Sequence, residues 1–346
     1  MNTLTTLRTL VLVAALAAPA AASAKISKEL RAELDGYVEP LKGDSDPVAR
    51  QAVFLTRALL EGKAASKDFE SATKDEDKRV RMAAGVAWYL TGDKKASDFL
   101  RAELASDASL IDTLYELIAV LPDKTEAKLL GDVWASATPD VKSTLARYMV
   151  TQTGPAFDLL AQTLNGKSAD DRKIVMQAMV FAAQPAVVAP LEKLLKSKDA
   201  GVRLDVARAF VALSKNNRLE SDARRVLGSL LKDKDAALQA VAAERMLELR
   251  DPAAVDVAFN LAKSAKEASQ RTEWFERLLA SQQRVAFASV KPYLAAEDAT
   301  EKLLAYKLAA TTKDDEFLAQ LLKMEQSTEF DQRMLAIEAL GYTGSE

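Results

Sequence analysis

A segment of about 31 to 32 residues recurs along most of this 346-residue chain, and that repeat constrains the fold more than any other feature. The clearest copies are residues 77–87 and 199–209. Each begins with an Asp, followed after two residues by Val-Arg and then by small and apolar residues at helical spacing. The other recognisable copies begin at Asp46, Thr138, Asp171, Asp235 and Asp331. The intervals between all these starts leave room for three degenerate copies near positions 108, 268 and 300.

The recurring positions have the properties of a first helix. Asp or Thr at the start can cap the helix N-terminus, and Pro47 and Pro139 follow where a missing N–H costs little. A small residue eight positions after the cap would let a neighbouring helix approach closely. Those small residues are Gly85, Ala146, Ala207, Ala243 and Ala339.

A second helix is predicted after a short break in each unit. Apolar residues recur there at spacings of three and four rather than two, and no segment alternates as a strand would. Doublets of large apolar residues are expected to mark its buried stripe. The doublets are Phe99-Leu100, Leu159-Leu160, Leu194-Leu195, Leu230-Leu231 and Leu321-Leu322.

A helix pair of this length cannot bury its apolar faces alone, whereas a row of such pairs can. The sequence therefore predicts an all-α fold, an α-solenoid of about ten stacked helix-pair repeats. No Gly-, Ser- or Pro-rich linker interrupts the repeats, so we expect a single domain over residues 25–346.

The Asp-x-x-Val-Arg-x-x-Ala pattern, with a following Gly-Asp or Asp-Pro turn, resembles the HEAT-repeat family. It is most similar to the short bacterial repeats also found in phycobilisome lyases. The resemblance implies binding of a protein or peptide on a concave face, and a ladder of Asp and Arg between repeats. Nothing marks a bilin site, so lyase activity is not expected. Arg50, Arg81 and Arg203 match the Arg position, Lys142 can substitute, and Gln239 and Leu335 depart, which predicts a discontinuous ladder.

The first 24 residues have the features of a secretory signal peptide. Arg8 supplies the positive region, residues 10–18 are apolar, and Ala22-Ser23-Ala24 forms a small-residue cleavage site. The apolar run is shorter than the roughly 20 residues that an uncleaved membrane anchor needs. We therefore expect cleavage after Ala24, a periplasmic or secreted location, and no membrane insertion afterwards.

Composition excludes several classes of active site. The chain has no cysteine and no histidine, which excludes thiol nucleophiles, Ser-His-Asp triads and zinc sites built on these residues. Lys and Arg total 47 against 50 Asp and Glu, and the net charge of −3 does not support nucleic-acid binding. No catalytic residue, cofactor or metal site is predicted, and the chain is not expected to be an enzyme.

Three weaker signals each have a structural interpretation. Residues 165–168 contain the Gly-Lys-Ser of a phosphate loop, but Ala161 stands where its first glycine belongs. The acidic triplets that begin at Asp44, Asp75 and Asp233 lack the remaining ligands of a calcium loop and are interpreted as caps and turns. Among the tryptophans, Trp88 is expected in the core. Trp134 and Trp274 stay open as ligand anchors.

Residues beside the apolar doublets should point away from the core. In the later repeats several of these are lysines, which predicts a mildly basic stripe that attracts an acidic partner if the second helices line the concave face. The alternative is an ordinary solvated surface. The candidate partner-binding residues are Lys193, Lys196, Lys232 and Lys323.

The favoured function is an exported, non-catalytic scaffold or adaptor that binds a protein or peptide. The last repeat is expected to be half a unit with uncapped apolar surface, which predicts end-to-end contact with itself or another protein. The alternative is an exported enzyme, or a regulatory subunit, that acts on a cell-envelope polymer through carboxylates. Such an enzyme would gather acidic residues with shifted pKa values in one cleft.

Overall fold

A computed structural model of the chain describes residues 28–119, 121–152 and 154–343. These residues contain α-helices and short 3-10 helices, and no strand is found among them. The predicted signal peptide, residues 1–24, lies outside the described residues. The structure divides into two compact units, residues 1–182 and 183–346. The prediction of a single domain therefore stays a prediction.

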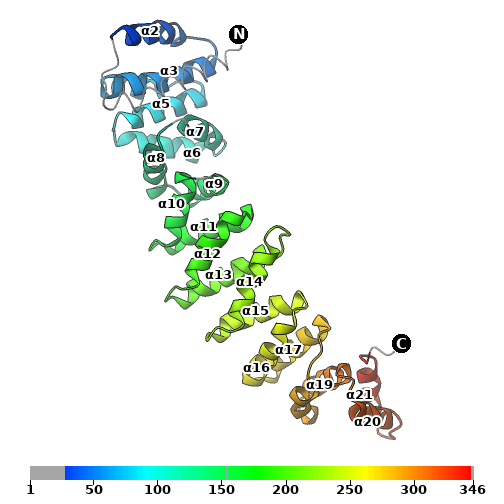
Figure 1. The fold of residues 1–346 in the computed structure, drawn as a ribbon. Coiled ribbons are helices and arrows are strands. Elements are labelled where there is room, and N and C mark those ends of the chain that lie inside the picture. The colour runs from blue at the N-terminus through cyan, green and yellow to red at the C-terminus, as the bar shows by residue number, and fades with distance from the viewer. Residues whose placement is uncertain (1–27, 120, 153, 344–346) are drawn as a thin grey trace. The chain divides into compact units, whose positions relative to one another are not determined.

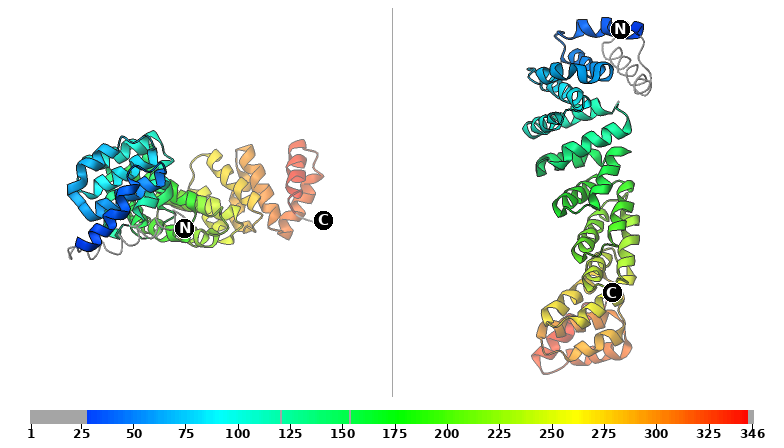
Figure 2. Two further views of the ribbon diagram at one scale, coloured as in Figure 1. Left: turned by 90° about the horizontal axis from the view of Figure 1, so that it is seen from above. Right: turned by 90° about the vertical axis from the view of Figure 1, so that its left-hand side faces the viewer.

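Unit 1 is a run of helices in which each packs on helices one or two places away in the chain (Figures 1 and 2). Helix α5 contacts α3, α4, α6 and α7, and α9 packs on α11. The helices are α2 (Lys28–Val38), α3 (Pro47–Glu61), α4 (Ser66–Ala72), α5 (Lys78–Leu90), α6 (Lys95–Ser106), α7 (Leu110–Ile118), α8 (Asp123–Ala135), α9 (Pro139–Met149), α10 (Pro155–Leu164) and α11 (Ala169–Ala182), with 3-10 helices η1 (Glu39–Leu41) and η2 (Gly62–Ala65).

Unit 2 continues the same alternation. Helix α17 packs on α16 and α19, and α21 packs on α19 and α20. The helices are α12 (Val188–Leu194), α13 (Ala200–Leu213), α14 (Glu220–Leu230), α15 (Ala236–Glu248), α16 (Val255–Ser264), α17 (Ala268–Ser281), α18 (Phe287–Val290), α19 (Ala299–Thr311), α20 (Asp315–Glu325) and α21 (Phe330–Leu340), with 3-10 helices η3 (Pro185–Val187), η4 (Pro252–Ala254) and η5 (Lys291–Ala295).

The predicted all-α solenoid is confirmed. The odd-numbered helices α3 to α21 are the first helices of ten repeats, which agrees with the expected number. The three degenerate copies are real, since α7, α17 and α19 begin close to positions 108, 268 and 300. The small residues eight positions after the proposed caps are all buried, as close helix packing requires.

Most of the predicted caps are confirmed. The side chains of Asp46, Asp77, Thr138, Asp199 and Asp235 each accept a hydrogen bond from a backbone N–H of the following turn. Such bonds satisfy N–H groups that have no partner inside the helix.

Two predicted caps are wrong. Asp171 is the third residue of α11, and its N–H donates to Ser168 Oγ at 3.2 Å. Asp331 is the second residue of α21, whose N-cap is Glu329. An acidic side chain is also favourable inside the first helical turn, because it faces the positive end of the helix dipole. The nearest aspartate is therefore an ambiguous marker of the helix start.

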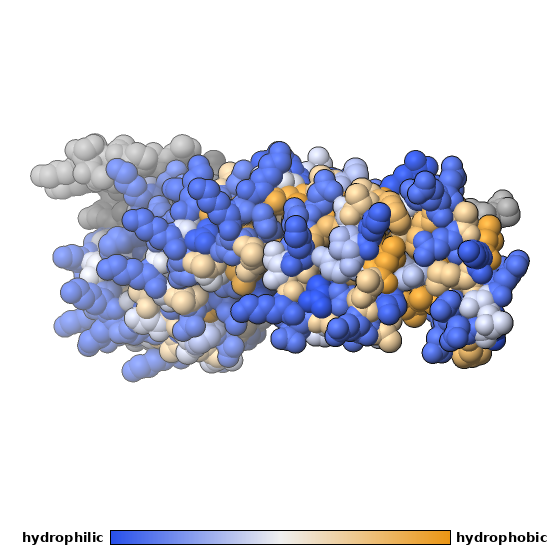
Figure 3. Space-filling view, turned by 90° about the horizontal axis from the view of Figure 1, so that it is seen from below, coloured by the Kyte–Doolittle hydropathy of each residue, from blue (hydrophilic) through white to orange (hydrophobic). Residues whose placement is uncertain are grey.

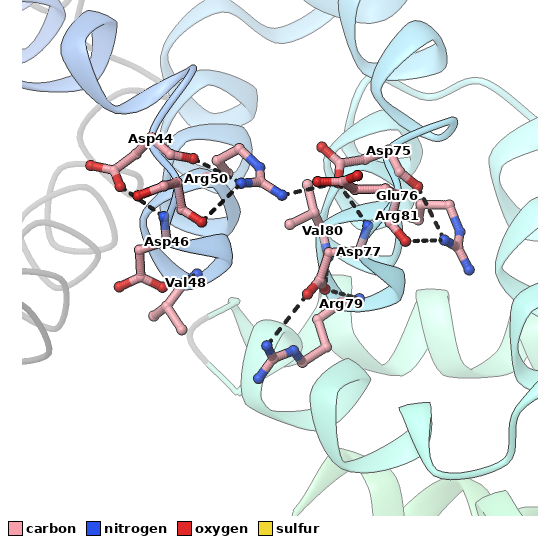
Figure 4. Close-up of polar contacts among 11 residues, drawn as sticks. Asp44, Asp46, Val48, Arg50, Asp75, Glu76, Asp77, Arg79, Val80 and Arg81 are labelled. Atoms are coloured by element: carbon pink, nitrogen blue, oxygen red, sulfur yellow. Dashed lines mark hydrogen bonds and ion pairs between the residues drawn. The ribbon is translucent and has the colours of Figure 1, made fainter.

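A basic residue four positions after the cap ties successive repeats together within each unit. Arg50 Nη1 donates to the carbonyl of Asp44 at 2.7 Å, while Nη2 reaches Asp75 at 3.1 Å in the turn before the next repeat (Figure 4). Lys142 Nζ also reaches forward, to Asp171 in the first turn of α11, at 2.9 Å. Arg81 also closes its own turn, but its forward contact is Glu103 on α6 of the same repeat.

The ladder is more continuous than the sequence predicted. With Glu329 as the cap, the fourth position of α21 is Arg333, not Leu335, and its Nη1 donates to the carbonyls of Ser327 and Thr328. Gln239 keeps the contact that closes the turn, because its Nε2 donates to the carbonyl of Asp233 at 2.8 Å. An amide carries no charge, so Gln239 makes the hydrogen bond to the turn but cannot form the ion pair that an arginine makes with the next repeat.

In most of the apolar doublets only one of the two residues is buried. Leu100, Leu160, Leu194 and Leu321 are buried, and only in the pair Leu230-Leu231 are both members buried. Leu322 is more than half exposed, so the expectation that every doublet lies in the core is wrong for this residue. Adjacent residues on a helix point about 100° apart, so a narrow contact stripe buries only one of them.

Candidate functional site

The four candidate lysines are all exposed, but they do not all lie on second helices. Lys193 is in α12 and Lys323 is in α20. Lys196 and Lys232 lie in the turns after α12 and α14, because those helices end at Leu194 and Leu230. Their assignment to second helices is therefore wrong, while their exposure agrees with a role in binding.

An ion pair lies beside two of these lysines. Arg225 donates to both carboxylate oxygens of Glu192, at 3.0 and 2.8 Å. These bonds, and more weakly the charge of Lys196, lower the pKa of Glu192 despite its partial desolvation. The surface around Lys193 and Lys196 thus contains an acid that is already paired with Arg225. Whether the four lysines form one stripe stays a prediction.

The outer face of α21 in unit 2 carries a stripe of large apolar side chains. Phe330 is 65% exposed, and Met334 and Ile337 follow at i+4 and i+7 on the same side of the helix. Tyr342, which follows α21, and Leu322 of α20 are also exposed. The opposite side of α21 presents Ala336 and Ala339, which are fully buried. A stripe on one helix face differs from the isolated exposed hydrophobic residues that any protein has.

Earlier repeats of unit 2 bury the position that α21 exposes. Ile337 is the eighth residue after the cap and is 48% exposed. The equivalent residues are Tyr306 of α19 and Phe275 of α17, which are 9% and 0% exposed. The segment that follows each helix covers them, since Tyr306 contacts Phe317 and Phe275 contacts Tyr293. Within the described residues, no helix covers Ile337 in this way.

Figure 3 shows that hydrophobic side chains on one face of the molecule gather in separate patches between hydrophilic ones. The α21 stripe has a mixed border of charge. The guanidinium group of Arg333 lies 5.8 Å from the Phe330 ring centre, and Lys307 Nζ lies 5.4 Å from that of Tyr342. Lys307 also pairs with Glu338 at 2.8 Å. An apolar centre with a charged border is typical of a protein interface.

A polar cavity of about 460 Å³ lies between α5, α6 and α8 of unit 1. Tyr89 Oη donates to Asp132 Oδ2 at 2.5 Å, and Lys128 Nζ lies 3.6 Å from the same carboxylate. Burial and the hydrogen bond to Asp132 raise the pKa of Tyr89. Arg101 Nη1 completes the network by donating to the carbonyl of Asp132 at 2.8 Å. The hydrogen bonds and the ion pair of this network are made mostly within it, so the network links α8 to α5 and α6.

Among the described residues, the carboxylates of Asp77, Asp107, Glu126 and Glu192 have shifted pKa values. Hydrogen bonds from Lys78 and Ser109 lower the pKa of Asp107 to about 2, and burial raises the pKa of Glu126. In the described part of the chain, no group of three acidic residues could hold a metal ion. The four carboxylates lie at the N-cap of α5, in the turn after α6, in α8 and in α12, and the lack of enzymatic activity stays a prediction.

The weaker sequence signals have structural roles. Trp88 is buried in α5, as expected. Trp134 is also buried and donates from Nε1 to Asp171 at 3.2 Å, whereas Trp274 is half-buried beside Arg277. The Gly-Lys-Ser segment lies in the turn between α10 and α11, where Ser168 caps α11.

Comparisons with known proteins place the chain in no family. No family model matches it, and no curated protein matches it. Among solved structures it is similar to the crystal structure of Kap121p, with 13% sequence identity and a TM-score of 0.32. That alignment covers 90% of this chain and 41% of the Kap121p chain.

No helix among the described residues has the length and apolar character needed to cross a membrane.

Proposed function

We propose that this chain is an exported, non-catalytic helical-repeat scaffold that binds a protein partner, and that the α21 stripe takes an amphipathic helix of that partner. The exposed stripe of Phe330, Met334 and Ile337 is the observation that carries the proposal. The equivalent face of the earlier first helices in unit 2 is covered by the next segment of the solenoid. A helix from another protein would take the place of that segment and cover the same apolar surface.

A photo-crosslinking residue at Ile337 tests this proposal directly. We expect the variant, exposed to native envelope extract, to crosslink to one protein at a segment with apolar residues at helical spacing. Adding Met334→Glu should remove that crosslink, because a charge in the apolar centre cannot be desolvated without cost. The same photo-residue at Asp256, an exposed position of α16, is the control and should give no crosslink.

The crosslinked species decides between a partner and self-association. A crosslink to a second copy of this chain would show end-to-end contact and would overturn the proposed partner helix. Equal labelling at Ile337 and Asp256 would show that the stripe has no specific occupant.

The candidate lysines give a second prediction for the same partner. Lys193→Glu with Lys196→Glu should weaken binding by about tenfold at low salt, since each reversed exposed pair changes the binding energy by up to ~1 kcal/mol. The dependence of affinity on salt should also become flatter. Isothermal titration with the crosslinked partner measures both. The exposed pair Lys74→Glu and Lys173→Glu in unit 1 is the matched control, and an unchanged affinity in the Lys193 and Lys196 variant would contradict the basic stripe.

A further inference from the structure

We propose that α7, α8 and α9 of unit 1 form a second binding site, which takes the Lys or Arg side chains of a basic protein segment. The site consists of the stacked pair Tyr115 and Tyr148 with the carboxylates of Asp112, Glu116 and Glu126. It is separate from the α21 stripe, and its test does not depend on that stripe.

The two tyrosines form the base of the site. Tyr115 of α7 is 4% exposed, while Tyr148 of α9 is half-buried and keeps one part in solvent. Their ring centres lie 3.6 Å apart, and the ring planes are inclined by 27°. The hydroxyl of Tyr115 is buried and makes no hydrogen bond, which is unusual because an unsatisfied buried polar group is costly. The cluster therefore has unused hydrogen-bonding capacity at its centre.

Unneutralised acids surround this pair. Asp112 and Glu116 are exposed on α7, one helical turn apart, and Glu126 is half-buried on α8 near Asp123. None of these four carboxylates has an ion pair or a side-chain hydrogen bond with any residue that the structure describes. Carboxylates elsewhere in unit 1, such as Asp75 and Asp171, do have basic partners.

The tyrosines and Glu126 respond to this negative environment. Burial, and then the charges of Asp112 and Glu116, raise the pKa of Tyr148. Burial, and then Asp123, raise the pKa of Glu126. Arg147 is adjacent in sequence to Tyr148, but its guanidinium group lies over the Phe181 ring at 5.5 Å. Lys124 is exposed on α8 between Asp123 and Glu126, and it forms no ion pair with any residue that the structure describes. The carboxylates of the site are therefore not paired with the basic residues of the same helices.

An ammonium or guanidinium group fits this combination of side chains. A cation is attracted to the face of an aromatic ring and can donate charge-assisted hydrogen bonds to a carboxylate. Asp112 and Glu116, as an i and i+4 pair, lie about 5–6 Å apart at their Cβ atoms. That separation suits two basic side chains of one peptide segment better than a single small ion.

Fluorescence anisotropy with a labelled eight-lysine peptide tests the site in the full chain. Wild type should bind in 50 mM salt, and the double variant Asp112→Asn and Glu116→Gln should bind at least about fivefold more weakly, since two charge contacts are lost. Tyr148→Leu should also weaken binding, because it keeps the charges but removes the ring. Circular dichroism should show an unchanged helix content, since the substituted carboxylates are exposed.

A control variant with the same change in net charge separates a site from general acidity. Asp256→Asn with Glu316→Gln removes two exposed carboxylates of unit 2 that have no ion pair among the described residues. It should change peptide affinity by less than about twofold, because isolated exposed charges contribute little and neither carboxylate belongs to the proposed site. Equal weakening by both double variants, or no peptide binding by wild type, would overturn the proposal. Ile337→Glu should leave peptide binding unchanged.

Discussion

Replacing Arg271 with leucine should lower the free energy of unfolding by about 3–5 kcal/mol, because it leaves a buried carboxylate without its partner. The side chain of Glu301 is 4% exposed, and Arg271 holds both of its oxygens, with Nε at 2.6 Å and Nη2 at 2.9 Å. The same guanidinium closes the preceding turn through the carbonyls of Ala265 and Lys266. The leucine side chain can make neither set of contacts.

Arg203→Leu is the matched control for this prediction. Arg203 occupies the same position in α13 and pairs with Asp235 at 2.9 Å, but the Asp235 side chain is 27% exposed. Water can solvate that carboxylate once the arginine is lost, so the expected loss is about 1–2 kcal/mol. Urea unfolding followed by circular dichroism measures both variants. Equal losses would show that the turn contacts, which the two arginines share, outweigh the burial of the acid.

Gly85→Ala should destabilise the protein by about 1–2 kcal/mol, although alanine favours helices more than glycine does. A Cβ atom at this position of α5 would lie 2.8 Å from ring atoms of Phe99 and 2.9 Å from Leu100 Cδ2. Leu100 is fully buried and has little room to move. Overpacking at the contact between α5 and α6 therefore outweighs the gain of up to ~1 kcal/mol in helix propensity.

Gly131→Ala should have the opposite effect. Gly131 is inside α8, and an added Cβ would meet nothing within 4 Å. Only the propensity term remains, so we expect a gain of about 0.5–1 kcal/mol. Thermal and urea unfolding of the two variants in parallel check the sign. A stabilising Gly85→Ala would mean that Phe99, which is only half-buried, moves away at little cost.

The helices of this fold could be predicted because the same pattern of cap and apolar residues recurs about every 31 to 32 residues. The starts of α7, α17 and α19 were found from spacing alone, where no clear motif remains. The exact helix starts are harder to predict, since Ser168 and Glu329 occupy the cap positions that the repeat pattern places at nearby aspartates. That shift also hid Arg333 from the ladder, because the expected position fell on Leu335.

The candidate sites were only partly predictable. The sequence identified all four candidate lysines as exposed, and it anticipated apolar surface on the last repeat. It missed Tyr115 and Tyr148, which lie about one repeat apart and stack because the repeat places α7 beside α9. Their separation of about one period is the signal in the sequence that connects them. Whether nearby basic residues such as Arg147 pair with the acids around them depends on side-chain directions, and no motif records those.

The arginine ladder also determines how the joints between repeats respond to salt. Arg50 and Arg203 hold their joints partly through charge, and these contacts weaken as ionic strength rises because both side chains of each pair are partly solvated, whereas the pair of Arg271 with the buried Glu301 is screened much less. Gln239 closes its joint through a neutral amide, which salt does not screen. The joint before α15 therefore combines two kinds of contact: a rise in ionic strength weakens the Arg203–Asp235 pair there, while the Gln239 amide continues to hold the turn.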